Sequence, residues 1–487
     1  MPDQKLENLL NLAMNALPQE RAKSENLNVG YDPTTRLWDV IVKYSGPESG
    51  LGGERIQVVP LLGSYAVVTL PETEISAYSV REQIEFIEKP KRLYFETFEE
   101  REASCILPVQ NGADGLTGKG ILVGIVDSGV DYFHPDFRNE DGSTRILRLW
   151  DQSVAGNPPE NYVSGTEYTK EEIDEALALG ETEGRRLVPS GDFSGHGTAV
   201  LGIAAGNGRA SEGVNRGVAY RSDLLVVKMG NPRENSFPRT TELMEGIDYL
   251  IRQAVKMRKP IVINVSFGNN YGSHTGNSLS ELYLNRVSLL GRISIIAAAG
   301  NEGASPVHTS GFLDQTVNVD FSISERQTSL NMQLWKDYAD DVRIKLRAPS
   351  GTEYTLSDNF GTNIETLDQT RIAFYNSAPS PFQRLQEYYF EFFPIADNFY
   401  LTSGVWSLII EPISIKNGSF EMWFPSASSL NGATRFLSPD PYNTLTIPSS
   451  ANSVITVGAY DAKTNTPADF SGRGAAAMPN LLTKPDL

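Results

Sequence analysis

The sequence contains a single cysteine, Cys105, among 487 residues. One thiol cannot form an intramolecular disulfide, so burial of apolar groups must stabilise the fold. No histidine lies near Cys105 in the sequence and no thiol-protease motif surrounds it. These two absences argue against Cys105 as a nucleophile.

The sequence also lacks an apolar run of the length that a transmembrane helix requires. Its N-terminal segment has neither the basic n-region nor the apolar h-region of a secretory signal. The segment is acidic and amphipathic instead, and Pro18 helps to close it as a helix. The residues that share one face of this helix are Leu6, Leu9, Leu10, Ala13 and Leu17. Export by the general secretory route is therefore not expected.

Positive charge is scarce, with a formal net charge of −18 and a pI near 4.8. This balance argues against a protein that binds phosphate backbones or an anionic membrane surface. The hydrophobic fraction of 40% and charged fraction of 21% are typical of an ordinary globular protein, for which acidity favours solubility. A chain of 487 residues suggests two or three domains.

Residues 1–100 are predicted to form a small α+β domain. The expected strands are 37–43, 56–60, 65–70 and 84–90, with a helix over 71–83. The charged segment from Phe95 to Glu102 lacks a strong pattern, and such a joint can be cut without damage to its neighbours.

Residues 101–312 and 444–487 are predicted to form one α/β domain. Its expected strands are 121–126, 224–229, 261–265, 293–298 and 454–459, and its clear helices are 241–257 and 278–290. Apolar strands that alternate with helices indicate a parallel sheet with helices on both faces. Ligands of such sheets bind beyond the carboxyl ends of the strands, where Asp127, Ser266 and Asn301 would lie.

Residues 313–443 are predicted to form an all-β sandwich inserted into the α/β domain. The helical pattern disappears here, and short alternating segments are separated by turn signals. The expected strands are 328–335, 342–347, 370–374, 388–393, 405–410 and 420–424. The α/β pattern returns at Val454, which makes this segment an insertion.

Three side chains supply the parts of an acyl-transfer site. Asp127 ends an apolar strand, where a carboxylate can orient an imidazole. His196 lies between glycines that permit close backbone approach, and imidazole suits proton transfer near neutral pH. Asn301 follows the tight Ala-Ala-Gly turn, where its amide can donate to an oxyanion. Taken singly, such residues more often belong to an ordinary turn, a helix cap and a loop. Their order along one sheet makes the combination specific for an acyl-transfer site.

The segments around Asp127, His196 and Asn301 resemble those of the subtilisin-like serine protease (subtilase) family, in which the chain order is Asp, His, Asn and then Ser. Asp127-Ser-Gly resembles the aspartate block, and Gly195-His-Gly-Thr198 resembles the histidine block. The resemblance implies that Ser266, Phe267 and Gly268 bind a peptide as an added strand. It further implies that Ala298, Ala299 and Gly300 form the opposite wall of the primary specificity pocket.

The resemblance also implies that residues 1–100 are a propeptide, an intramolecular chaperone and inhibitor that self-cleavage within residues 95–104 removes. With the sandwich insertion, the likeness is greatest to the Csp germination proteases of clostridial spores. We therefore expect a serine endopeptidase that acts on protein or peptide substrates, is cytoplasmic or spore-associated, and binds neither nucleic acid nor membrane.

The nucleophile block of the family, Gly-Thr-Ser-x-Ala, does not occur in the sequence. In the family it follows Lys-Pro-Asp-Leu, which here is Lys484–Leu487, so we expect the serine beyond residue 487 and no activity from these residues alone. Ser471 resembles a loop residue that precedes the nucleophile. The alternative is a catalytically inactive pseudoprotease that acts as a protein-binding or signalling module.

No metal or cofactor is expected. His134 is close to the aspartate block, but a structural role is favoured over a metal ligand. His274 and His308 lack Cys or His partners at ligand spacing. Acidic loops leave calcium open, although no EF-hand pattern is present.

Overall fold

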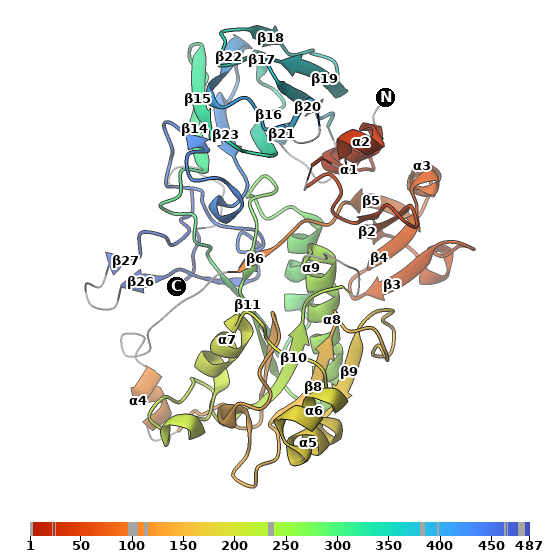
Figure 1. The fold of residues 1–487 in the computed structure, drawn as a ribbon, viewed down its shortest axis with the longest axis vertical. Coiled ribbons are helices and arrows are strands. Elements are labelled where there is room, and N and C mark those ends of the chain that lie inside the picture. The colour runs from red at the N-terminus through yellow and green to blue at the C-terminus, as the bar shows by residue number, and fades with distance from the viewer. Residues whose placement is uncertain are drawn as a thin grey trace.

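A computed structural model describes residues 3–21, 23–24, 26–95, 106–111, 115–231, 238–379, 385–396, 399–461, 464, 466–475 and 483–487. Within them the chain forms an α/β domain, an N-terminal α+β domain and a two-sheet sandwich (Figure 1). The boundaries at residues 100, 312 and 443 remain predictions.

The α/β domain is built on a seven-stranded sheet in the order β25-β13-β11-β7-β10-β8-β9. Its strands are β7 (Leu122–Asp127), β8 (Ile146–Asp151), β9 (Thr166–Thr169), β10 (Asp223–Lys228), β11 (Ile261–Val265), β13 (Ile293–Ala298) and β25 (Ile455–Val457). All neighbours pair in parallel except β8 with β9, which pair antiparallel. The five strands predicted here are confirmed; β8 and β9 were not predicted.

Helices cover both faces of this sheet, with α8 and α9 in one apolar cluster and α5 and α7 in another. They include α5 (Lys170–Leu179), α6 (Glu181–Leu187), α7 (His196–Ala205), α8 (Thr240–Met257) and α9 (Leu279–Ser288). Close packing depends on Gly124 of β7, because a Cβ there would lie 2.9 Å from the Leu250 side chain of α8. The two predicted helices, α8 and α9, are confirmed.

The N-terminal domain has a five-stranded antiparallel sheet. Its elements are α1 (Asn8–Asn15), α2 (Pro18–Arg21), β1 (Tyr31–Asp32), β2 (Leu37–Tyr44), β3 (Gln57–Leu61), β4 (Tyr65–Pro71), α3 (Ile75–Ser79) and β5 (Ile84–Glu88). The helix predicted over 71–83 is shorter, and Leu17, expected on the buried helical face, follows α1 and is 57% exposed. Pro18 begins α2, where its missing N–H has no helical partner to lose.

The sandwich consists of two antiparallel sheets, one of six strands and one of five. The first contains β14 (His308–Phe312), β16 (Leu330–Asp337), β19 (Gly361–Leu367), β20 (Thr370–Asn376), β21 (Leu385–Pro394) and β23 (Ser419–Trp423). The second contains β15 (Val317–Ile323), β17 (Asp341–Arg347), β18 (Glu353–Thr355), β22 (Gly404–Ser414) and β24 (Arg435–Phe436). Alternate residues of both sheets fill a common apolar core, so the predicted all-β insertion is confirmed.

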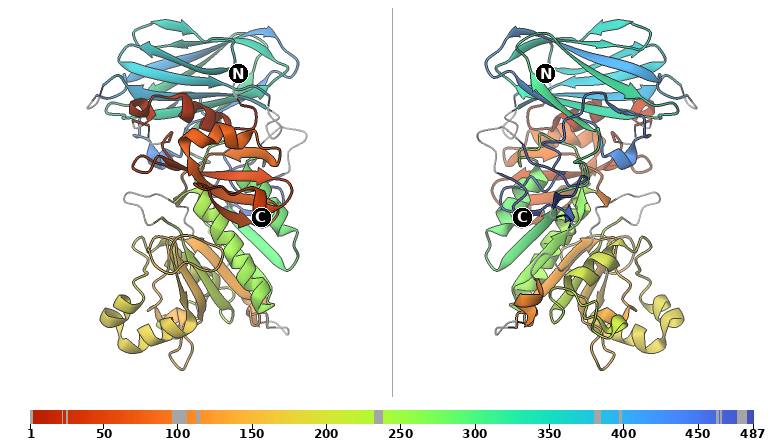
Figure 2. Two further views of the ribbon diagram at one scale, coloured as in Figure 1. Left: turned by 90° about the vertical axis from the view of Figure 1, so that its right-hand side faces the viewer. Right: turned by 90° about the vertical axis from the view of Figure 1, so that its left-hand side faces the viewer.

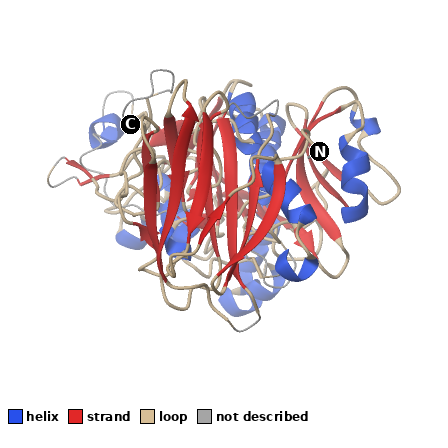
Figure 3. Ribbon diagram, turned by 90° about the horizontal axis from the view of Figure 1, so that it is seen from above, coloured by secondary structure: helices blue, strands red, loops and turns tan. Residues whose placement is uncertain are grey.

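The N-terminal domain lies between the other two domains (Figure 2). Helix α1 packs on β19, β20 and β21, and Figure 3 shows the N-terminal helices beside the long strands of the sandwich. Helix α8 contacts β2 and β3 on the opposite side. One apolar cluster joins α1 residues such as Leu9 to Ala373 and Tyr389 of the sandwich.

Among the described residues, no helix is both long and apolar enough to cross a membrane.

Candidate active site

Asp127 is the last residue of β7 and is completely buried. The strand is apolar throughout and is paired on both edges, by β10 and β11, so its end is fixed at the carboxyl edge of the sheet. The Ser128 N–H donates to Asp127 Oδ1 at 2.7 Å. Burial raises the pKa of Asp127, while hydrogen bonds from the His196 ring and the Ser128 N–H act in the opposite direction.

His196 lies against Asp127, with 2.7 Å between His196 Nδ1 and Asp127 Oδ1. It is the first residue of α7 and is 7% exposed. When Nδ1 donates to the carboxylate, Nε2 carries the lone pair of the ring and can accept a proton. The structure therefore brings the predicted acid and base together in the geometry of a catalytic dyad.

Two glycines make this approach possible. Gly195 adopts a φ of +77°, which favours glycine, immediately before the helix. A Cβ on Gly197 would collide with the Gly129 carbonyl oxygen and would crowd Asp127 Oδ1 at 3.1 Å. A side chain at position 197 would thus push the start of α7 away from the carboxylate.

Asp192, to which the sequence analysis gave no role, organises the loop before His196. Its Oδ1 accepts from the Gly195 N–H at 2.9 Å and the Ser128 hydroxyl at 2.8 Å. Its Oδ2 accepts from Thr198 N–H at 2.8 Å and Thr198 Oγ1 at 2.7 Å. Burial alone would raise the pKa of Asp192, but these hydrogen bonds lower it below its ordinary value. An aspartate shortly before a helix start is the sequence signal that could have identified it.

The predicted peptide-binding strand is occupied by the N-terminal domain itself. Phe267–Gly268 forms the short strand β12, and it pairs antiparallel with β6 (Tyr94–Phe95). Residue Phe267 is opposite Phe95, and Gly268 is opposite Tyr94. The Phe267 ring is also edge-on to the His196 ring, with 6.2 Å between centroids. Figure 1 shows β6 near the middle of the molecule, above α7.

The other side of this groove was not predicted from the sequence. Pro238 O accepts from the Leu93 N–H at 3.0 Å, and the Thr240 N–H donates to Lys91 O at 2.9 Å. Thr240 Oγ1 accepts from the Lys91 N–H at 3.0 Å. Residues 91–95 are thus bonded from both sides, as an extended peptide is held in a two-sided cleft. No motif marks Pro238, which begins a described segment in front of α8.

Ser266 precedes β12 and is 5% exposed. Its Oγ accepts from Asn264 Nδ2 at 2.8 Å, so the side chain is turned toward its own strand. Its backbone connects β11 to β12 at the carboxyl edge of the sheet.

Ala298, Ala299 and Gly300 continue from β13 at the same edge. Ala298 ends the strand, and Ala299 is held by hydrogen bonds to Val457 O at 2.9 Å and from the Thr446 N–H at 3.1 Å. Gly300 has a φ of +98°, and its carbonyl accepts from the Gly472 N–H at 2.8 Å. This segment is rigid backbone, as the wall of a binding pocket requires.

Asn301 follows this turn, two strands away from Asp127 in the order β13-β11-β7. Its side-chain oxygen is buried, and no described residue donates a hydrogen bond to it. The three predicted side chains therefore share one edge of one sheet. Direct contact joins Asp127 and His196.

The other histidines have structural partners. His134 Nδ1 accepts from the Asp136 N–H at 3.3 Å and caps a short helix. His274 and His308 both stack on Trp423, with centroid distances of 4.2 and 4.9 Å. Within the described ranges, no cluster of three or more His, Cys, Asp or Glu residues could hold a metal ion.

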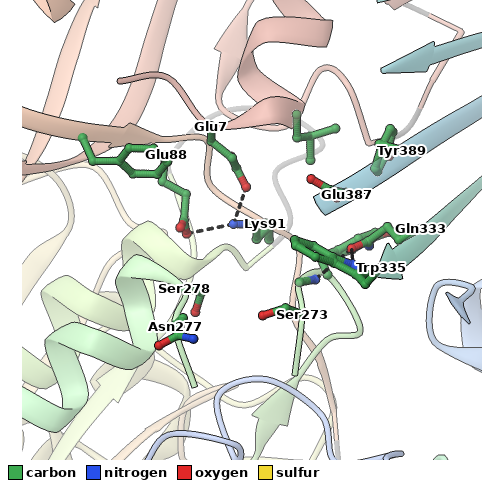
Figure 4. A pocket seen from close by; sticks show the side chains of 14 residues that line it. Glu7, Glu88, Lys91, Ser273, Asn277, Ser278, Gln333, Trp335, Glu387 and Tyr389 are labelled. Carbon is green, nitrogen blue, oxygen red and sulfur yellow. Dashed lines mark hydrogen bonds and ion pairs between the residues drawn. The ribbon is translucent and has the colours of Figure 1, made fainter. Parts of the chain in front are cut away.

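A separate cavity of about 40 Å³ lies where the three domains meet (Figure 4). Lys91 Nζ bridges Glu7 and Glu88 there at 2.8 Å each. Glu387 of the sandwich faces the same space and accepts from Asn8 Nδ2 at 2.7 Å. This volume suits a few water molecules rather than a substrate.

Comparisons with known proteins agree with this arrangement. The profile of the Csp protease B prodomain matches residues 4–91, and that of the subtilase family matches residues 118–362. The solved structure of the Clostridium perfringens CspB protease is 36% identical and superposes with a TM-score of 0.71. That similarity covers 79% of this chain and 77% of the other.

Two curated relatives are more distant. The major intracellular serine protease of Bacillus subtilis is 29% identical over 191 residues, which are 39% of this chain and 46% of the relative. The subtilisin-like protease PopC of Myxococcus xanthus is 27% identical over 230 residues, or 45% of this chain and 41% of the relative. The chain thus spans less than half the length of these two relatives.

Proposed function

Because the chain belongs to the subtilase family, we propose that it is the pro-form of a serine endopeptidase with an Asp127–His196 dyad. The observation that carries this proposal is the 2.7 Å contact between His196 Nδ1 and Asp127 Oδ1 beside a groove that holds an extended peptide. In this role His196 Nε2 takes the proton of a serine hydroxyl and then gives it to the leaving amine. Asp127 keeps the ring in one tautomer and stabilises the imidazolium.

Asn301 donates its side-chain amide to the oxyanion in this proposal. A donor of this kind typically changes kcat by about 10²- to 10³-fold. Its support is its place at the carboxyl edge of the sheet, directly after the rigid Ala299–Gly300 turn.

The nucleophile is proposed to be a serine outside residues 1–487, because the Gly-Thr-Ser-x-Ala block does not occur within them. The surface of α7 supports a further segment near the dyad. After Thr198 this helix contains only apolar residues and glycine, a pattern typical of a helix that is covered on most sides. Its Leu201 and Ala205 pack against the sheet, but Ala199 is exposed and Ile203 is 41% exposed. A polypeptide that carries the nucleophile would cover this face.

The N-terminal domain is proposed to act as an intramolecular inhibitor. Its segment 91–95 fills the cleft between Pro238–Thr240 and Phe267–Gly268, where substrate would bind. Leu93 is only 1% exposed and joins the apolar core of the α/β domain, so the segment is anchored by a side chain as well as by backbone. Protein substrates would bind as this segment does, after its release.

The proposal is tested with the product of the complete coding sequence. We expect self-processing within residues 95–104, most of which lie outside the described residues, as read by N-terminal sequencing of the mature protein. His196→Ala should abolish processing, and Asp127→Asn should lower kcat by about 10⁴-fold. A downstream sequence without the serine block, or cleavage that is undiminished in His196→Ala and therefore independent of this histidine, would instead favour a protein-binding pseudoprotease.

A further inference from the structure

Glu302 is a buried carboxylate that accepts a hydrogen bond from a backbone N–H of the sandwich. It immediately follows Asn301 and is 6% exposed. Its two carboxylate oxygens accept from the Ala427 N–H at 3.2 and 3.4 Å. Ala427 begins the short helix η5 (Ala427–Ser429) at the base of the sandwich. A buried carboxylate is retained only where such donors compensate its desolvation.

Two serines complete this contact. The hydroxyls of Ser305 and Ser426 lie near the Glu302 side chain and act to lower its pKa, and Ser426 is 4% exposed. The Ser305 N–H donates to Glu302 O at 3.0 Å. Burial raises the pKa of Glu302, and these hydroxyls and the Ala427 N–H oppose that rise. The carboxylate is therefore fixed between its own loop and the sandwich.

On its other side, the loop of residues 300–303 is held by backbone hydrogen bonds to residues 470–472. The Gly303 N–H donates to Phe470 O at 2.9 Å, and a Cβ on Gly303 would collide with the Ser471 carbonyl. The Gly300 carbonyl is bonded to the Gly472 N–H at 2.8 Å. Residues 300–303 are thus clamped between the backbone of 470–472 and the contact with Ala427.

Asn301 lies within this held segment, but its side-chain oxygen is not itself hydrogen-bonded by a described residue. The direction of its amide is therefore set by the backbone on either side of it. Because an error of about 1 Å in such a group can lower a rate by roughly 10²-fold, the clamp matters for catalysis.

We propose that Glu302 is a positioning residue that ties the oxyanion donor Asn301 to the sandwich through the Ala427 N–H. The proposal rests on the proposed peptidase function. It assigns the inserted domain a specific part in the reaction, which is to hold the amide of Asn301 where the oxyanion forms. The tie acts on the transition state, so its loss should lower kcat and leave KM nearly unchanged.

The test uses the complete protein and an internally quenched peptide with the sequence of residues 91–100. Glu302→Ala removes the acceptor, whereas Glu302→Gln keeps an oxygen that the Ala427 N–H can reach. Ala427→Pro removes only the donor, since proline is accommodated at the first position of a helix and Ser426 already has the extended ψ of 138° that precedes proline. Glu325→Ala, which removes an exposed carboxylate of the sandwich, is the matched control.

We expect Glu302→Ala and Ala427→Pro each to lower kcat about tenfold with KM changed less than about twofold. The double variant should be no slower than either single variant, and Glu302→Gln should retain at least about half of kcat. In an Asn301→Ala background, Glu302→Ala should have almost no further effect. If Glu302 contributed only to stability, Glu302→Ala would still lower kcat in the Asn301→Ala background. The melting temperature would then fall in parallel with kcat.

An unchanged kcat in Glu302→Ala, or an undiminished effect in the Asn301→Ala background, would overturn the inference while the unaltered enzyme remains active. If Glu302→Ala does not fold, the Ala427→Pro comparison decides in the same way. Failure of the unaltered complete protein to cleave the peptide would overturn the proposed function, and this inference with it.

Discussion

The backbone of Phe95 pairs with that of Phe267 in an antiparallel bridge, which places the last described strand of the N-terminal domain in the peptide groove. Phe267 also stands 6.2 Å from the His196 ring, measured between centroids. One residue thus contacts the His196 ring and pairs with the segment of the N-terminal domain. The two segments are consequently complementary at the level of backbone hydrogen bonds, a mode that tolerates many side chains.

Leu93 should contribute most of the apolar anchoring of this segment. Its side chain is 1% exposed, so Leu93→Ala removes a filled apolar contact at a typical cost of about 2 kcal/mol or more. Hydrogen exchange of the amides of residues 91–95 should become about thirtyfold faster or more. Val80→Ala, at a position 74% exposed in the same domain, is the control and should leave this exchange unchanged. Equal protection in both variants would show that backbone bonds alone hold the segment.

Two glycines of α7 should respond oppositely to the same added methyl group. Gly197→Ala forces a collision with the Gly129 carbonyl, so we expect a loss of about 1–3 kcal/mol in the free energy of unfolding. Gly202 has nothing within 4 Å of its missing Cβ, so Gly202→Ala should stabilise the 487-residue chain by up to about 1 kcal/mol. Urea unfolding of the two variants measures both values. Similar destabilisation by both would contradict the tight packing of α7 against Asp127.

The contact between Asp127 and His196 could be predicted from the sequence, whereas the second side of the groove could not. Asp127 could be predicted because it ends an apolar strand, and His196 because it lies between two glycines before a helix. Pro238 and Thr240, which form the second side of the groove, carry no such signal. Their role depends on a segment some 150 residues earlier, and no local periodicity records a contact of that separation.

Helix α8 shows the same limit in the fold. Its spacing predicts an amphipathic helix, which normally turns its polar face to water. In the structure that face is covered by β2 and β3 of the N-terminal domain, so that Glu242, Glu245 and Asp248 are buried. Asp248 accepts from the Leu62 N–H at 2.9 Å, a contact between domains. A polar helical face that binds another domain is indistinguishable in sequence from one that binds water.

His274 should make stability fall in mild acid. Burial lowers the pKa of His274 to about 4, with a smaller contribution from His308 in the same direction. The unfolded chain therefore binds more protons than the folded chain between about pH 4 and 6.5, so stability rises with pH across this window. The expected change is about 1.4 kcal/mol per pH unit. Chemical unfolding from pH 4 to 7 should show this slope, and His274→Gln should reduce it; an identical slope in the variant would exclude His274 as its source.

Glu387 should make the contact between the sandwich and the N-terminal domain weaker as pH rises. Its carboxyl is 5% exposed and accepts from Asn8 Nδ2 of α1 at 2.7 Å. Burial raises the pKa of Glu387 to about 8, the charge of Glu7 adds to the rise, and Lys91 opposes it. When the N-terminal domain departs, this carboxyl meets water and its pKa returns toward the ordinary value of about 4.3. The assembled form therefore holds the extra proton between these two values.

The difference between these two pKa values of Glu387 decides how the stability of the contact changes with pH. Stabilisation of the contact is complete below the lower pKa and is lost as pH rises through the higher one, by about 1.4 kcal/mol for each pH unit in between. Equilibrium unfolding of the N-terminal domain, followed by hydrogen exchange in α1 at pH 6, 7 and 8, should show the decline. Glu387→Gln is neutral at every pH and should flatten the profile, because it keeps an oxygen for Asn8. A decline of equal slope in Glu387→Gln would assign the pH dependence to other carboxyls of the interface, such as the buried Glu88, whose pKa burial also raises.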